Sequence, residues 1–192
     1  MELFEFKDKI YYLKGTGVLV NLKHLSQKYS DCTIVIMGDG GISSSKQLNE
    51  LEKNIHYLEN ANITLAFVRG CHDFPHMYDN TVLGKSIILI EDYSVMNNTL
   101  FIGGRVYYNR WIYGFNNNHP VKKISDLQLD ELFANRYIDK VVTICFPSSI
   151  FPICNTISEY NASLQDSDLL NDILIERRYI NDVIDKLIQS RN

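Results

Sequence analysis

The most constraining feature of the chain is an alternation of two hydrophobic periods between residues 9 and 68. Short apolar runs occupy 9–13, 33–37 and 62–68, and the stretches between them repeat apolar residues at helical spacing. Uninterrupted apolar runs are typical of strands buried on both faces, and such strands joined by helices form parallel sheets. The sequence therefore predicts a strand–helix–strand–helix–strand unit around a buried parallel sheet.

The two predicted helices carry apolar residues on one face, and the second also has a start signal. Ser44 is followed three residues later by Gln47, which is the pattern of a capping box. The apolar face consists of Val18, Leu22, Leu25 and Tyr29 in the first predicted helix and of Leu48, Leu51, Ile55 and Leu58 in the second.

Beyond residue 80 the pattern changes to shorter runs. Residues 86–90, 93–96 and 100–102 predict three strands, and the little room between them favours an antiparallel ladder. A helix over 127–137 and a buried strand over 141–146 follow.

A final amphipathic helix is predicted over 168–189. Its apolar stripe runs from Leu170 to Ile188 and is interrupted by Arg177, whose stem can lie on the apolar surface with the charge at the edge. This helix either folds back over the second half of the chain or offers the stripe to a homodimer or protein partner. An exposed sheet edge is the other expected partner surface.

The composition is that of an ordinary globular protein with a single domain over 1–192. The hydrophobic fraction is 45% and the net charge is −4, with no basic run that would favour nucleic acid. No apolar run reaches membrane-spanning length, and the acidic, mixed N-terminus does not resemble a secretory signal. Four cysteines without a C-x-x-C pair are expected to be reduced thiols, which favours a cytoplasmic location.

Glycine-containing loops follow each of the first three predicted strands. They are Lys14-Gly15-Thr16-Gly17, Gly38-Asp39-Gly40-Gly41 and Arg69-Gly70-Cys71-His72-Asp73. In a parallel sheet the carboxyl ends of the strands meet at one edge, where ligands bind, and glycine allows the backbone to approach a ligand closely. We therefore expect these loops to converge on a binding site.

Two of these loops carry a family resemblance. Gly38-Asp39 and Gly70-Cys71-His72-Asp73 resemble the G-D and G-N-H-D/E motifs of calcineurin-like metallophosphoesterases. In the same order, 100–111 is similar to the family's G-G-x-x-S-x-D-x-x-R segment, 124–132 to the helix after it, and 141–147 to its strand ending in T-H-x-P. The resemblance covers most of the chain. It implies an α/β fold of two packed mixed sheets flanked by helices, shortened at the C-terminus.

The resemblance also shows where the chain departs from the family's metal ligands. Family members hold two divalent ions with a D-x-H pair, the Asp of G-D, the Asn of G-N-H, the His of T-H and a late G-H-x-H. Here the D-x-H positions fall on Lys14 and Thr16, the Asn on Cys71 and the T-H histidine on Ile144. The G-H-x-H strand would come after the last helix, beyond the end of the sequence.

Asp39, the bridging ligand, and His72, a general acid or stabiliser of transition-state charge in the family, are retained. Two cations about 4 Å apart need several anionic or imidazole ligands, so the resemblance implies a degenerate site without two-metal catalysis. We expect Lys14 to replace the metal charge through a salt bridge to Asp39.

Three functions follow as alternatives. The first is a binding or interaction module without a cofactor, able to take a phosphorylated small molecule. The second is an active phosphomonoester or phosphodiester hydrolase with a rearranged Mn, Fe or Zn site, in which Asp39 binds metal and His72 is catalytic. The third is a structural subunit completed by a partner. The candidate ligand-binding residues are Lys14, Thr16, Arg69, Cys71 and Asp73.

Simpler interpretations of the same residues stay open. Asp39 can be a turn carboxylate, since Asp favours turns and helix starts. Cys71 can join His72 and His76 on a soft metal, although this spacing fits no common tetrahedral site. Residues 14–17 can form an anion-binding nest at a helix start. Arg69 and Arg105 can line the cleft or be solvated charges. His24, His56 and His119 are predicted at the surface or in loops, and Tyr107, Tyr108 and Trp111 in core packing.

Overall fold

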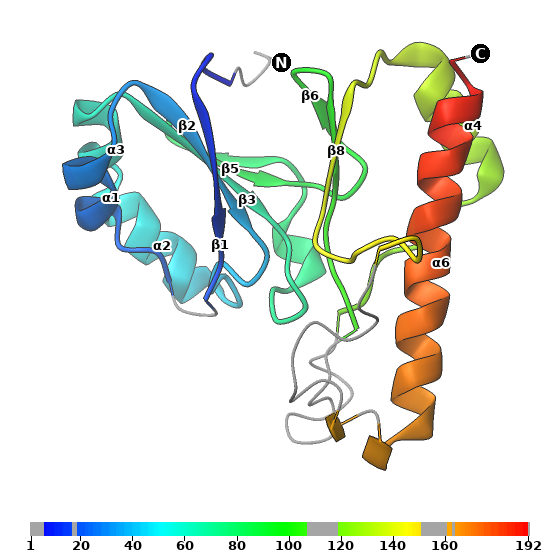
Figure 1. Ribbon diagram of the computed structural model, residues 1–192. Helices are drawn as coiled ribbons and strands as arrows, with labels where there is room; N and C mark the ends of the chain where they lie inside the picture. Colours follow the sequence, from blue (N-terminus) through cyan, green and yellow to red (C-terminus); the bar gives the residue numbers. More distant parts are fainter. Residues whose placement is uncertain (1–5, 17–18, 107–118, 151–160, 163, 192) are drawn as a thin grey trace.

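The computed structural model describes residues 6–16, 19–106, 119–150, 161–162 and 164–191. Within them, two mixed sheets have strand orders β1-β2-β3-β5-β4 and β6-β7-β8, with helices on the outer face of each (Figure 1). The predicted α/β class is confirmed. The elements are β1 (Ile10–Lys14), α1 (Leu22–Lys28), β2 (Cys32–Met37), α2 (Ser45–Asn54), α3 (His56–Asn60), β3 (Ile63–Val68), η1 (Pro75–Met77), β4 (Thr81–Leu83), β5 (Ile87–Ile90), β6 (Val95–Met96), β7 (Thr99–Ile102), α4 (Asp126–Asn135), β8 (Lys140–Thr143) and α6 (Ser167–Gln189).

The first sheet begins with the predicted parallel unit. β1 pairs with β2 and β2 with β3, all in parallel, and all six residues of β3 are buried. Helices α1, α2 and α3 cover the outer face of this sheet (Figure 1), and Leu25, Leu51 and Leu58 are buried against it. Fully burying one such leucine contributes about 1.5–3 kcal/mol, so the apolar faces of the helices help to stabilise this half of the fold.

The strands after residue 80 differ from the predicted single antiparallel ladder. β6 and β7 do form an antiparallel pair, but β5 joins the first sheet, parallel to β3, and β8 pairs in parallel with β7. All four residues of β5 are buried. A strand that is apolar on both faces needs cover on both, and a position inside the first sheet supplies it. β4, which the sequence did not indicate, lies antiparallel to β5 at the sheet edge.

The predicted capping box at Ser44 is wrong. Ser44 is the residue before α2, but its side chain accepts no backbone hydrogen bond, and its hydroxyl is paired with the side chain of Gln47 instead. A complete box occurs at the start of α4, where Ser125 Oγ accepts from Gln128 N at 3.3 Å and Ser125 N donates to Gln128 Oε1 at 2.9 Å. The second predicted helix is also interrupted, ending as α2 at Asn54 and resuming as α3 at His56.

The two sheets pack face to face through one shared apolar cluster. Val35, Ala66 and Ile88 of the first sheet meet Phe101 and Val142 of the second. These residues are buried because each sheet has a second apolar face that the outer helices do not cover. The arrangement of two packed mixed sheets with flanking helices therefore agrees with the one that the family resemblance implies, although the arrangement alone shows no specific fold family.

Helix α6 lies over the second sheet (Figure 1), so its apolar stripe is used within the chain. Ile180, Val183 and Leu187 are buried in the core of that sheet, while Ile188 at the end of the stripe is 54% exposed. The expectation that the Arg177 charge lies at the solvent edge is wrong. Arg177 is 3% exposed, because carbonyl groups of the loop after β8 accept its guanidinium hydrogen bonds.

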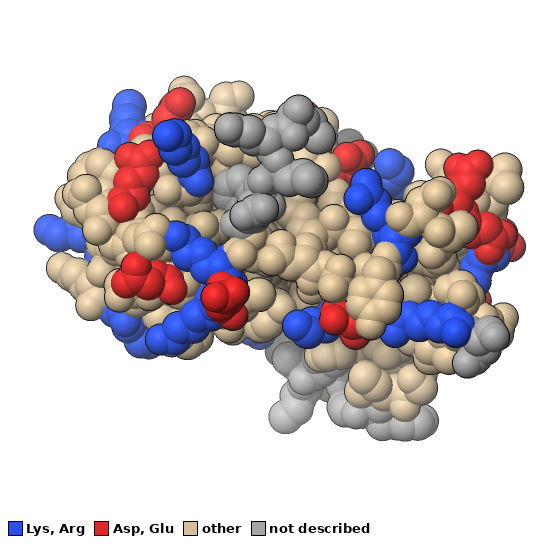
Figure 2. All heavy atoms as spheres, turned by 90° about the horizontal axis from the view of Figure 1, so that it is seen from above, with Lys and Arg blue, Asp and Glu red and all other residues tan. Residues whose placement is uncertain are grey.

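None of the helices in the described part of the chain is long and apolar enough to cross a membrane. On the face shown in Figure 2, Lys and Arg side chains are interspersed with Asp and Glu. Mixed charges of this kind are typical of an ordinary solvated surface.

Candidate functional site

The glycine loops after β1, β2 and β3 converge, as predicted, at the carboxyl ends of these strands. Gly15 N donates to Met37 O at 3.2 Å, and Gly38 N donates to Val68 O at 3.0 Å. A Cβ on Gly15 would lie 1.6 Å from the Gly38 carbonyl oxygen, so only glycine allows the first two loops to touch. A fourth loop joins them from β8, since a Cβ on Gly38 would lie 3.1 Å from Ile144 Cγ2.

Asp39 lies at the centre of these loops, with its backbone at φ +45°. Its carboxylate Oδ1 is 3.5 Å from Cys71 Sγ and accepts the backbone N–H of His72 at 3.1 Å. A Cβ on Gly70 would lie 2.0 Å from Asp39 N, so this close approach again needs glycine. The potential ligand atoms of Asp39, Cys71 and His72 all lie within 4.8 Å of one another.

Asp73 holds two of the loops together from inside the protein. Its side chain accepts three backbone N–H groups, from Gly70 at 2.8 Å, Gly40 at 3.2 Å and Ile42 at 3.1 Å. The residue is 1% exposed. Burial raises the pKa of Asp73, and the three backbone donors oppose that rise. The sequence predicted a ligand-binding role, but the contacts of this carboxylate are to the loops themselves.

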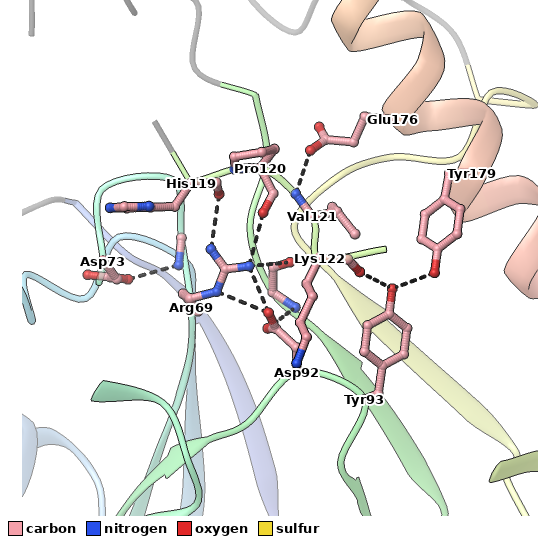
Figure 3. Close-up of polar contacts among 12 residues, drawn as sticks. Arg69, Asp73, Asp92, Tyr93, His119, Pro120, Val121, Lys122, Glu176 and Tyr179 are labelled. Atoms are coloured by element: carbon pink, nitrogen blue, oxygen red, sulfur yellow. Dashed lines mark hydrogen bonds and ion pairs between the residues drawn. The ribbon is translucent and has the colours of Figure 1, made fainter. Parts of the chain in front are cut away.

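Arg69, also a predicted ligand-binding residue, is 1% exposed and directs its guanidinium into the protein (Figure 3). Its Nη2 and Nε lie 2.7 Å and 3.1 Å from Asp92 Oδ2. Nη1 donates to His119 O at 3.0 Å, and Nη2 donates to Pro120 O at 3.1 Å. The side chain therefore joins the end of β3 to the loop after β5 and to the segment that begins at 119.

The same segment is held from its other side by α6 (Figure 3). Glu176 accepts the backbone N–H groups of Val121 at 2.7 Å and Val106 at 2.9 Å, and Tyr179 Oη accepts from Ile124 N at 2.9 Å. Burial raises the pKa of Glu176. A continuous buried polar network thus connects the first sheet to the last helix.

His119 lies outside any helix or strand, as predicted, and its position is beside the site. Its backbone N–H donates to Cys71 O at 3.2 Å, and its ring is edge-on to Phe74 at 5.4 Å. Burial, followed by the charge of Arg69, lowers the pKa of His119. No motif marks this residue, because the fold alone brings it next to Cys71. His24 and His56 are exposed, as predicted.

Lys14 and Thr16 are both exposed at the rim of the site. Within the described residues no ion pair joins Lys14 to Asp39, so the expected salt bridge is wrong. The physical reason is that the Cys71 thiol and the His72 N–H already contact the Asp39 carboxylate, while Lys14 ends an edge strand open to water.

The residues of the site do not fit the two-metal centre that the family resemblance implies. Among the described residues the group of possible ligands contains one carboxylate, that of Asp39, and Ile144 lies against Gly38 where an imidazole would be needed. Burial, followed by the Asp39 charge, raises the pKa of Cys71, so its thiol is protonated at neutral pH. One carboxylate, one thiol and one imidazole cannot balance two divalent ions.

The raised pKa gives a direct test at Cys71, which is 1% exposed. Because the thiolate is the reactive form, we expect iodoacetamide at pH 8 to label Cys71 at least about tenfold more slowly in native protein than in urea. Peptide mass spectrometry separates Cys71 from the other cysteines. Equal labelling rates in the two solvents would contradict the buried, protonated thiol.

The predicted aromatic cluster (Tyr107, Tyr108 and Trp111) lies outside the described residues, as does Cys154. Cys32, Cys71 and Cys145 are free and buried, as expected for reduced thiols. Comparison of the chain with protein-family models, with curated proteins and with solved structures finds no match.

Proposed function

We propose that the chain is a binding module with a metallophosphoesterase-type fold and without two-metal catalysis. The observation that carries this proposal is which chemical groups the converging loops place around Asp39. Asp39 is surrounded by a protonated thiol, a backbone N–H and loops that present Lys14 and Ile144 in place of ligands. Without a metal-activated hydroxide, the described residues of the site offer no activated nucleophile for phosphate-ester cleavage.

The ligand class is a small phosphorylated molecule. The exposed Lys14 ammonium and Thr16 hydroxyl lie on either side of Gly15 at the rim of the site. An ammonium group can bind a phosphate as a point charge, and a hydroxyl can donate to its oxygens. A cytoplasmic location and the absence of a cofactor belong to the same proposal.

Metal content is the first test. After incubation with manganese and dialysis, elemental analysis is expected to find a manganese-to-protein ratio near zero. The wild type, Asp39→Asn and the control Asp31→Asn are then expected to be equal in metal content and to lack turnover of p-nitrophenyl phosphate. Asp31 is a matched control because it is an exposed aspartate that also has positive φ, +49°. A ratio near two, or turnover that Asp39→Asn abolishes, would overturn the proposal.

A second candidate is a hydrolase with a rearranged single-metal site. The observation that favours it is the clustering of the Asp39, Cys71 and His72 ligand atoms within 4.8 Å. In that case Mn, Fe or Zn would be held by these groups in place of the missing ligands. A metal ratio near one, with turnover that is lost in Asp39→Asn but kept in Asp31→Asn, would favour this candidate. A structural subunit completed by a partner is the third alternative.

A further inference from the structure

The outer strands of the two sheets border one apolar groove. β1 is one edge of the first sheet and β8 is one edge of the second (Figure 1). Residues of both strands line a cavity of about 500 Å³. Tyr12 and Met37 form the wall on the first sheet, and Phe146, Ile150 and Ile184 lie on the side of the second. Within the described residues the second sheet has three strands and the first has five, so no described strand lies opposite the inner face at β1.

The groove is exposed, apolar and bounded by unpaired strand edges. Tyr12 is 42%, Phe146 44% and Ile150 47% exposed, although all three are large apolar side chains. Within the described residues β1 pairs only with β2, and β8 pairs only with β7. An exposed edge next to apolar pockets is the arrangement in which an added strand gains main-chain hydrogen bonds and buries alternate side chains.

The loop that forms one wall is fixed before any partner arrives. The buried Arg177 guanidinium donates to Pro147 O at 3.1 Å and also to Ile150 O, and Ser148 N donates to Arg177 O at 3.1 Å. Because α6 holds this loop in place, binding would not require ordering it first. A preformed wall lowers the entropic cost of association.

The charges around the groove indicate the chemistry of the occupant. Lys140 is the charged residue among the ten that line it, and β1 ends at the exposed Lys14. Neither edge strand contains an acidic residue, so pairing of these edges between two copies of the chain would place lysines on both sides without an opposing carboxylate. A strand with acidic residues among its apolar ones would complement the groove.

We propose that this groove binds an extended segment of another protein, which adds a strand at the β8 edge, turns apolar residues toward the groove and carries an acidic residue on that same face near Lys140. The apolar side chains cover Tyr12 and Met37, and the acidic one faces Lys140. This inference goes beyond the proposed function and does not depend on whether Asp39 binds metal.

Fluorescence anisotropy of the full chain with two labelled peptides tests the proposal. One nine-residue peptide has glutamate at positions 1 and 9, valine at positions 3, 5 and 7 on the same face, and threonine at the positions between them, and the other has lysine in place of glutamate. The glutamate peptide is expected to bind about tenfold more tightly than the lysine peptide. Lys140→Glu is expected to remove or reverse that preference, and Tyr12→Ser or Phe146→Ser to weaken binding about tenfold.

Leu127→Ser is the matched control, because Leu127 is 68% exposed and lies outside the groove, and it is expected to bind like the wild type. Circular dichroism and thermal unfolding verify that each variant is folded. The proposal is overturned if neither peptide binds, if both bind equally, or if the groove variants bind as tightly as Leu127→Ser. Sedimentation velocity that shows a dimer disrupted by Phe146→Ser would also overturn it, since a second copy would then be the occupant.

Discussion

Replacing Arg69 with methionine is expected to lower the free energy of unfolding by about 3–5 kcal/mol. Arg69 and its partner Asp92 are 1% and 8% exposed, so the substitution leaves a carboxylate buried without its counter-charge. It also removes the donors to the carbonyl groups of His119 and Pro120. The urea concentration at the midpoint of unfolding should therefore fall, and Tm should drop by roughly 10 °C.

Two further variants make this result specific to the buried pair. Arg178→Met removes an exposed arginine and is expected to change stability by less than about 0.5 kcal/mol. The double variant Arg69→Met/Asp92→Asn is expected to recover part of the loss, because the orphaned charge is gone. A loss below about 1 kcal/mol for Arg69→Met would contradict the assignment of Arg69 to the fold.

The second large effect is expected at Asp73. Asp73→Ala leaves the buried N–H groups of Gly40, Ile42 and Gly70 without an acceptor, and each unsatisfied buried group costs about 1–3 kcal/mol. We expect a loss of about 3–5 kcal/mol in urea unfolding. Asp79→Ala is the matched control, because Asp79 is an exposed aspartate whose contacts are to the neighbouring Thr81. Equal stability of the two variants would contradict the role of Asp73 in holding the loops together.

The Asp73 effect also has a pH dependence of defined sign. Burial raises the pKa of Asp73 above its ordinary value of 3.8, so the folded protein binds this proton more tightly than the unfolded chain does. The stabilisation that comes from this tighter proton binding is fully present below about pH 3.8 and is lost as the pH rises through the raised pKa. Asn cannot titrate, so the stability difference between wild type and Asp73→Asn should shrink as the pH rises. A difference that grows with pH would contradict the raised pKa.

Much of the site could be predicted from the sequence because its loops follow buried strands. The glycines at 15, 38 and 70 marked the three loops, and their convergence follows from the geometry of a parallel sheet. The roles of the polar residues could not be assigned in this way. Arg69 and Asp73 are charged residues of the kind that line binding sites. Both side chains point inward instead, because they pair with Asp92 and Ile42, which come from other segments of the chain.

The sequence by itself determined the parallel core of the first sheet and the presence of the last helix. Apolar runs and helical spacing are local properties, and they were enough to specify the β1–β3 unit, its helices and the final helix α6. Only the tertiary structure decided which sheet β5 joins, that His119 lies beside Cys71, and that β1 and β8 share one apolar groove. These are contacts between segments far apart in the chain, and they depend on which faces remain to be buried after the local elements have formed.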